Sequence, residues 1–106
     1  FTDGSRVKKD YARAAHWFKK AARRGNAKAQ FNLGLLYENG NGLARNLKKA
    51  SEWYLMAAKQ DHFRAQENLG WMYVNGLGVK EDLDEAEKWY KRSESLGKYS
   101  KKPKLN

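Results

Sequence analysis

Two serines in this chain stand three residues before a lysine, which is the spacing that serine acyl-enzymes use to activate a hydroxyl group. The pairs are Ser5 with Lys8 and Ser95 with Lys98. In such enzymes the serine attacks an acyl group, and further Ser-Asp-Asn and Lys-Thr-Gly motifs complete the site. The chain contains neither companion motif. One pair is expected in a loop between helices and the other at a helix end, so the sequence predicts that neither is catalytic.

The titratable residues do not suggest a metal site. His16 and His62 are the only histidines, the chain has no cysteine, and a zinc site needs three or four such ligands held together. Carboxylates gather at the expected start of the last helix, where negative charge complements the backbone dipole. We therefore expect no metal and no cofactor. The carboxylates concerned are Glu81, Asp82, Asp84, Glu85 and Glu87.

Two glycine-rich turns could in principle hold a phosphate group at a helix start. They are Gly40-Asn41-Gly42 and Gly76-Leu77-Gly78. Both turns lack the third glycine of the dinucleotide motif and follow expected helices rather than strands. They are therefore interpreted as connections between helices.

These turns belong to a repeat that runs through the chain with a period of 36 residues. The segment Leu33-Gly34-x-x-Tyr37 returns as Leu69-Gly70-x-x-Tyr73, and Ala50-x-x-Trp53-Tyr54 returns as Ala86-x-x-Trp89-Tyr90. A period of about 20 to 50 residues that holds two helical patterns indicates a solenoid of stacked helix pairs. The apolar spacing predicts helices over 10–24, 27–38, 46–59, 63–74 and 82–96.

Helix ends are marked by short polar residues and by glycines. Asp10, Asn46 and Asp82 are expected to cap helix starts, with Glu85 completing a capping box at the last one. A left-handed glycine is expected after four of the helices, and Asp61 stands at the equivalent position of the remaining one. The four glycines are Gly25, Gly40, Gly76 and Gly97.

Two further glycines fall inside expected helices, where glycine is unfavourable. Gly34 and Gly70 each follow a core leucine. We expect them to allow the close approach of a neighbouring helix through its tryptophan, Trp53 or Trp89. The tryptophans and tyrosines of the second helices, including Trp17, are predicted to belong to the core.

The repeat resembles that of the Sel-one-like repeat (SLR) family, a relative of the tetratricopeptide repeats, over residues 1–97. The resemblance implies an all-α fold, a right-handed alpha-alpha superhelix (TPR-like solenoid) of stacked antiparallel helix pairs. It also implies a non-catalytic scaffold or adaptor that binds proteins. Some cysteine-rich relatives have been discussed as lactam-directed hydrolases, but this chain has no cysteine. The matching residues are Ala65, Leu69, Gly70, Tyr73, Gly76, Gly78, Val79, Asp82, Ala86, Trp89 and Tyr90.

The sequence departs from the repeat at a few positions. Arg6 replaces the glycine found at Gly42 and Gly78, and Ser93-Glu94 replaces two alanines. Phe1 stands at the position of Tyr37, so we expect a partial first unit and about 2.5 repeats of period 36 over residues 1–97, taken from a longer array. Residues 98–106 are expected to form a basic tail. An incomplete first unit could stack end to end on another copy.

The net charge of +10 is unevenly distributed along the chain. Residues 1–30 carry nine Lys or Arg against two acidic residues, whereas residues 61–90 carry three against seven. A basic surface of this kind could bind nucleic acid or an anionic membrane, which is the alternative function. No nucleic-acid-binding motif accompanies the charge, so nucleic acid is not the expected partner, and the sequence contains no membrane-spanning segment.

The expected partner is a protein or an extended peptide, bound by the first helix of each pair, which the resemblance places on the concave face. Two equivalent stripes on these helices each combine a cation, an amide, an apolar group and a second amide. Amides can bond a peptide backbone, a cation can meet a carboxylate, and an apolar group can cover a side chain. Alternatively, Leu35 and Trp71 pack against neighbouring units while Asn39 and Asn75 end their helices. The predicted binding residues are Lys28, Asn32, Leu35 and Asn39, with Arg64, Asn68, Trp71 and Asn75.

Overall fold

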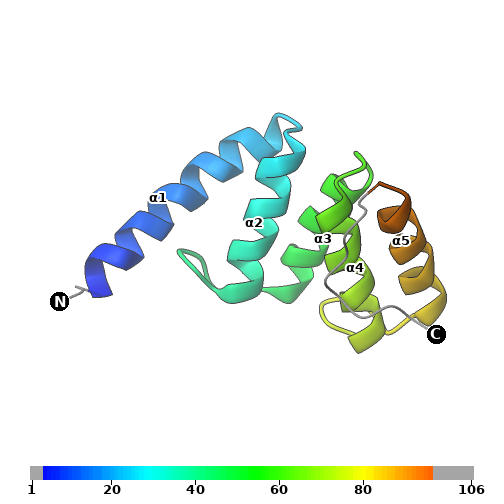
Figure 1. Ribbon diagram of the computed structural model, residues 1–106. Helices are drawn as coiled ribbons and strands as arrows, with labels where there is room; N and C mark the ends of the chain where they lie inside the picture. Colours follow the sequence, from blue (N-terminus) through cyan, green and yellow to red (C-terminus); the bar gives the residue numbers. More distant parts are fainter. Residues whose placement is uncertain (1–3, 97–106) are drawn as a thin grey trace.

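The computed structural model describes residues 4–96 and contains five α-helices within them (Figure 1). The predicted tail 98–106, the cap Gly97 and Lys98 lie outside these residues. Four helices agree with the predicted ranges to within one residue, while the first begins earlier than expected. The helices are α1 (Gly4–Arg23), α2 (Ala27–Asn39), α3 (Leu47–Ala58), α4 (Phe63–Asn75) and α5 (Leu83–Leu96).

The helices follow one another along the molecule in chain order (Figure 1). Each helix packs mainly on the helix before it and the helix after it, and the molecule is elongated, with extents of 44 × 26 × 25 Å. Contacts restricted to neighbours are the defining property of a solenoid. The predicted all-α architecture of stacked helix pairs is therefore confirmed.

The core combines alanines with a few large side chains. Ala50, Ala57 and Ala58 of α3 are completely buried, and they allow neighbouring helices to approach closely. The larger buried side chains come from α2, α3 and α4 and fill the remaining space. They are Leu33, Tyr54, Leu69 and Met72.

The mid-helix glycines do allow a close approach, but a tyrosine rather than a tryptophan occupies the space. A Cβ atom at Gly34 would lie 2.6 Å from Cδ1 of Tyr54, and one at Gly70 would lie 3.2 Å from the ring of Tyr90. The expectation of Trp53 and Trp89 at these sites is therefore wrong. The tyrosine lies one residue further along the helix and faces the preceding helix directly.

The three repeated tryptophans differ in burial. Trp53 and Trp89 are half-buried against the core, whereas Trp17 is 63% exposed. Within residues 4–96, no helix precedes α1, so Trp17 lacks the cover that α2 and α4 give to the helices that follow them. Its ring contacts His16 and Lys20 of its own helix instead. The prediction that Trp17 belongs to the core is wrong for this chain.

The second position of each Gly-x-Gly turn requires glycine for two structural reasons. Gly42 and Gly78 have φ of 76° and 71°, in the left-handed region. In addition, a Cβ atom at Gly42 would meet the carbonyl oxygen of Tyr11, and one at Gly78 would meet that of Leu47. Each turn therefore presses its backbone against the second helix of the preceding unit, which supports the interpretation of these turns as connections.

Two of the three predicted helix starts are confirmed. Asn46 Oδ1 accepts from the Lys49 amide at 3.0 Å, and Asp82 Oδ1 accepts from the Glu85 amide at 3.0 Å. The predicted capping box is wrong, because the Asp82 amide donates to the carbonyl of Tyr73 instead of to Glu85. Asp10 caps no helix, since it lies inside α1.

Residues 4–9 are helical although a loop was predicted for them. In the later units the loop is held by the contact of Gly42 with α1 and by a hydrogen bond from the Asn46 amide to the Tyr37 carbonyl. At the first position Arg6 replaces this glycine, and the segment continues α1 instead. The Ser5 and Lys8 pair therefore lies on a helix and not in a loop.

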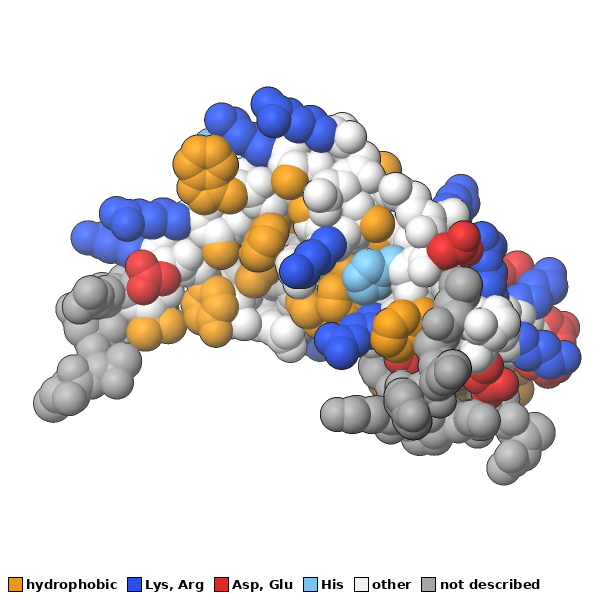
Figure 2. All heavy atoms as spheres, turned by 45° about the horizontal axis from the view of Figure 1, so that its top comes forward, with side chains coloured by type: hydrophobic (Ala, Val, Ile, Leu, Met, Phe, Trp, Pro, Cys, Tyr) orange, Lys and Arg blue, Asp and Glu red, His pale blue; other side chains and the backbone are white. Residues whose placement is uncertain are grey.

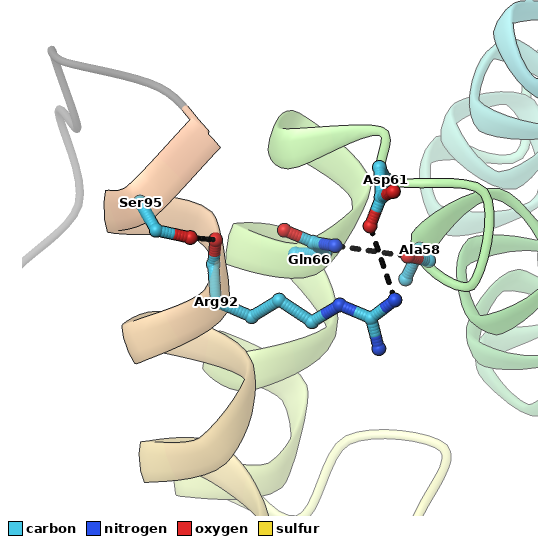
Figure 3. Close-up of polar contacts among 5 residues, drawn as sticks. All are labelled: Ala58, Asp61, Gln66, Arg92 and Ser95. Carbon is cyan, nitrogen blue, oxygen red and sulfur yellow. Dashed lines mark hydrogen bonds and ion pairs between the residues drawn. The ribbon is translucent and has the colours of Figure 1, made fainter.

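The other helix ends follow the predicted pattern. Gly25, Gly40 and Gly76 have positive φ, and Asp61 is the only other residue type that adopts it among residues 4–96, with φ of 64°. The Asp61 carboxylate lies 3.0 Å from the guanidinium of Arg92 on α5 (Figure 3). The turn between α3 and α4 is thereby linked to the last helix.

Candidate functional site

The two helices that carry the predicted binding residues begin with equivalent caps. Asn26 Oδ1 accepts from the Ala29 amide at 2.8 Å, and His62 Nδ1 accepts from the Ala65 amide at 3.2 Å. The two capping residues are one repeat apart, and both have extended backbone. These caps fix where the first turns of α2 and α4 begin, and so where their side chains project.

Between these two helix starts the surface is hollowed into a depression of about 460 Å³. We call it the α2–α4 depression. Figure 2 looks onto this side of the molecule and shows hydrophobic side chains exposed between separate Lys and Arg side chains. From α2 it is lined by Lys28, Phe31 and Asn32, and from the following turn and α4 by Asp61, His62, Phe63 and Arg64.

Aromatic rings form much of the lining. The Phe31 and His62 rings stack with centroids 4.7 Å apart and planes 26° apart, and Phe31 also lies 5.7 Å from the buried ring of Tyr54. The guanidinium carbon of Arg64 lies 5.9 Å from the centre of the Phe63 ring. The depression therefore offers apolar ring surface with cations beside it.

The charges around the depression are unbalanced. Lys28 and Arg64 are exposed, and neither has a carboxylate partner within residues 4–96. The one acidic residue of the lining, Asp61, is paired with Arg92. The α2–α4 depression therefore favours a negatively charged group.

His62 contributes a hydrogen-bond donor to the same place. Its Nδ1 accepts from the Ala65 amide, so the proton of the neutral ring is assigned to Nε2. Desolvation by burial lowers the pKa of His62, and the charge of Arg64 lowers it further. The ring is therefore neutral near pH 7, with an N–H group that can donate.

The last turn of α2 and the middle of α4 are linked through Tyr54 of α3. Its hydroxyl donates to Glu38 Oε1 at 2.6 Å, and burial and this carboxylate raise its pKa far above the ordinary value. A side-chain hydrogen bond with Asn68 acts on the same hydroxyl in the opposite direction. Asn68 thus lies at the point where α3 contacts α4, and its amide is held in place.

The eight predicted residues all reach the surface to some extent, but the structure brings only some of them together. Lys28, Asn32 and Arg64 line the depression. Leu35 packs partly against the core, and the Asn75 amide donates to the Trp71 carbonyl at 2.9 Å, which are contacts of the alternative interpretation. Asn39 is the last residue of α2. Binding by these residues remains a prediction.

Where the structure describes their side chains, the residues with possible catalytic chemistry make structural contacts. Ser95 Oγ donates to the Arg92 carbonyl at 2.8 Å (Figure 3). His16 makes an edge contact with Trp17 on α1, remote in the chain from the cap His62. In the part of the chain that the structure describes, no three His, Cys, Asp or Glu residues are grouped so that they could hold a metal ion.

The acidic residues at the start of α5 and on its surface form contacts that stabilise this helix. Asp82 caps it, Glu87 lies 2.8 Å from Lys91, and Glu85 lies 3.7 Å from Lys88. These are interactions with a helix terminus and with neighbouring turns of the same helix, as expected for a solvated surface. Among residues 4–96, no helix is both long and apolar enough to cross a bilayer.

The caps at Asn26 and His62 and the aromatic lining of the depression were not predicted from the sequence. Asn26 and His62 are one period apart and each precedes a predicted helix, which is a signal that was available. Phe31 and Phe63 gave no comparable signal, because the residue one period from Phe31 is Glu67. Their proximity depends on how α2 and α4 are placed by α3.

Comparison with known protein families identifies the repeat that the sequence resembles. The Sel1 (Sel-one-like) repeat matches residues 1–26, 27–62 and 63–98. No curated protein matches the chain significantly.

Solved structures with this architecture include a Sel1 repeat protein from Oxalobacter formigenes, with 44% identity and a TM-score of 0.80 over 81% of the chain. Another is c5321, described as a protective antigen present in uropathogenic Escherichia coli strains that displays an SLR fold, with 38% identity and a TM-score of 0.81 over 82% of the chain. The cysteine rich protein B of Helicobacter pylori is 26% identical, with a TM-score of 0.76 over 78% of the chain. The chain spans 35%, 19% and 62% of these proteins, respectively.

Proposed function

Because this chain belongs to the Sel1 repeat family, whose repeats typically mediate protein interactions, we propose that it is a non-catalytic module that binds an extended segment of a partner protein along α2 and α4. The observation that carries the proposal is the α2–α4 depression, where the first turns of two equivalent helices meet. Three of the eight predicted binding residues line it: Lys28, Asn32 and Arg64.

The side chains along these helices suit a peptide main chain. Asn32 is half-buried at the depression and carries both a donor and an acceptor, which matches the alternating groups of an extended backbone. Asn68, one period later, is also half-buried. Leu35 and Trp71 lie between these amides and the ends of the helices, and their exposed parts can cover an apolar side chain of the partner.

A binding role without catalysis is supported by the state of the serines on α3 and α5. Ser51, Ser93 and Ser95 each donate their hydroxyl proton to a carbonyl of their own helix, at 2.7, 2.8 and 2.8 Å. A serine nucleophile requires a base beside its hydroxyl, whereas the hydrogen bonds that these three hydroxyls donate within residues 4–96 go to backbone carbonyls. We propose that they stabilise the helices.

Affinity capture from cells with the full-length protein, followed by mass spectrometry, tests the proposal. The double variant Asn32→Ala/Asn68→Ala should lose the captured partner and still unfold cooperatively. The matched control is Glu52→Ala/Lys88→Ala, which changes two exposed residues that are also one period apart but lie on α3 and α5. Equal capture by all three proteins would contradict binding along α2 and α4.

A further inference from the structure

The lining of the α2–α4 depression has a chemical character that restricts what it can bind. We infer that it takes an acidic side chain of the partner segment together with a neighbouring apolar side chain. This inference rests on the proposed function and names the partner chemistry of the same surface.

The preference for an acidic group follows from the donors around the depression. Lys28 stands on the first turn of α2 and Arg64 on the first turn of α4, so the two cations line the depression from two different helices. The Nε2–H of His62 and the amide of Asn32 add two neutral donors. A carboxylate can accept from several such groups at once, and hydrogen bonds between charged partners are stronger than neutral ones.

The acidic residue within the lining does not cancel this preference. The Asp61 carboxylate lies 3.0 Å from the guanidinium of Arg92, which approaches from α5 (Figure 3). Because the charge of Asp61 is balanced by Arg92, Asp61 does not compensate the positive charges of Lys28 and Arg64. Neither cation forms an ion pair within residues 4–96.

The neighbouring apolar side chain is indicated by the aromatic rings. Phe31 is half-buried, because one face of its ring stacks on His62 and it also approaches Tyr54, yet it still lines the depression. Phe63 lines it from α4 beneath the guanidinium of Arg64. Exposed ring surface beside two cations suits a partner residue pair such as glutamate and phenylalanine, in which one side chain is charged and the next is apolar.

The test is selection from a library of random peptides that are joined to a carrier protein at both ends. Each peptide then has no free terminal carboxylate, so its only carboxylates are those of its Asp and Glu side chains. The immobilised chain is compared with Lys28→Gln/Arg64→Gln and with the control Arg13→Gln/Lys48→Gln. The control removes the same charge from exposed positions on α1 and at the start of α3. The unchanged chain and the control should enrich peptides with Asp or Glu beside an aromatic or aliphatic residue, and the first variant should not.

Enriched sequences are then made as peptides with blocked ends, and their Kd is measured. Replacing the selected glutamate by glutamine should weaken binding about threefold to tenfold, and the Lys28→Gln/Arg64→Gln variant should no longer distinguish the two peptides. Raising the salt concentration should weaken binding of the acidic peptide to the unchanged chain. Melting curves of all variants establish that the substituted proteins are folded.

Several outcomes would overturn the inference. Enriched peptides that lack acidic residues, yet lose binding in Asn32→Ala/Asn68→Ala, would refute the acidic preference and leave the proposed function intact. Failure to enrich any peptide would count against both. Enrichment only from a library with free carboxyl ends would assign the site to a chain terminus. Self-association that disappears in Lys28→Gln/Arg64→Gln would show that a second copy occupies the depression.

Discussion

At the scale of single residues, the mid-helix glycines show how the repeat is built around one close contact. Gly34 and Tyr54 lie on consecutive helices, and the completely buried tyrosine ring occupies the space that a side chain at residue 34 would need. The equivalent pair, Gly70 and Tyr90, is less tightly packed. The glycines are therefore required by packing, although they are unfavourable within a helix.

Gly34→Ala should destabilise the protein more than Gly70→Ala. The new methyl group at residue 34 would lie 2.6 Å from Cδ1 of Tyr54, so the ring must move, whereas at residue 70 the nearest atoms are 3.2 Å away. Overpacking of this kind costs about 1–3 kcal/mol, against a gain of roughly 1 kcal/mol in helix propensity. Urea unfolding of the two variants measures the difference. A larger loss at residue 70 would contradict this account of the packing.

Asp61→Gly should stabilise the protein by up to about 1 kcal/mol, since glycine adopts a left-handed backbone without strain. The substitution also removes the ion pair with Arg92, but both side chains are about half exposed, and exposed pairs contribute only about 0–1 kcal/mol. Arg92→Gln is the control, because it breaks the ion pair and keeps the backbone of residue 61. If Asp61→Gly and Arg92→Gln lowered the free energy of unfolding equally, the ion pair would outweigh the strain.

At the scale of helices, equivalent ends are held by chemically different caps. The first turn of α2 begins with an asparagine and the first turn of α4 with a histidine, and both accept a hydrogen bond from the amide three residues later. Asparagine does not titrate in the physiological range, whereas histidine does. The start of α4 is therefore sensitive to pH, unlike the start of α2.

Stability should fall as the pH is lowered through the range in which His62 takes up a proton. Because burial lowers its pKa in the folded protein, the unfolded chain binds the proton first, and stability decreases from about pH 7 downward until the folded-state pKa is passed. His62→Asn, which copies the cap of α2, should keep the helix start and reduce this pH dependence. Melting temperatures between about pH 5 and pH 7 measure it, and an unchanged slope in the variant would refute the assignment to His62.

The interfaces between helix pairs also differ in how their buried glutamines are satisfied. Gln30 Nε2 donates to the Ala22 carbonyl, and its Oε1 accepts from Gln60 at 2.9 Å. Gln66, one period later, donates to the Ala58 carbonyl (Figure 3), but its Oε1 has no partner within residues 4–96. The sequence at residue 96, which corresponds to Gln60, is leucine.

Gln60→Leu should therefore destabilise the first interface by about 1–3 kcal/mol, because it leaves a buried carbonyl oxygen of Gln30 without a donor. Gln60→Glu is a useful comparison, since it keeps the size of the side chain but removes the donor. Denaturant unfolding of the two variants gives the loss in free energy. No loss in either variant would show that water replaces the Gln60 amide.

At the scale of the whole molecule, the repeat made most of the fold predictable. Residues that recur at a fixed period, such as Leu33 with Leu69 and Tyr54 with Tyr90, predicted both the helices and their order, because each unit contacts mainly its neighbours. Two of the errors, at Trp17 and at the start of α1, lie where the repeat is incomplete. A repeated position predicts burial because a neighbouring helix packs against it. No helix among residues 4–96 packs against these parts of α1 from the preceding side, so the prediction fails there. The others, the capping box at Asp82 and the tryptophans expected at the mid-helix glycines, concern which of two adjacent or nearby groups makes a contact.

The candidate site was less predictable than the fold. Lys28, Asn32 and Arg64 were identified from their positions on the helix faces, and they do line one depression. Its aromatic surface was missed, because Phe31 and Phe63 occupy different positions in the repeat and meet only through packing. Helix periodicity gives the direction of a side chain, whereas the shape of a surface also depends on the distance between helices.

The same arrangement predicts an uneven stability along the molecule. The first part of α1 has no helix beside it among residues 4–96, and Val7 and Tyr11 are 38% and 40% exposed. Helices without such packing are marginally stable in water, and weakly packed segments open locally without global unfolding. Amide hydrogen exchange should therefore be fast in α1 before about Ala14 and slow in α2, α3 and α4. A chain whose α1 amides exchange as slowly as those of α3 would instead unfold as one unit, and the neighbour-by-neighbour account of its stability would be wrong.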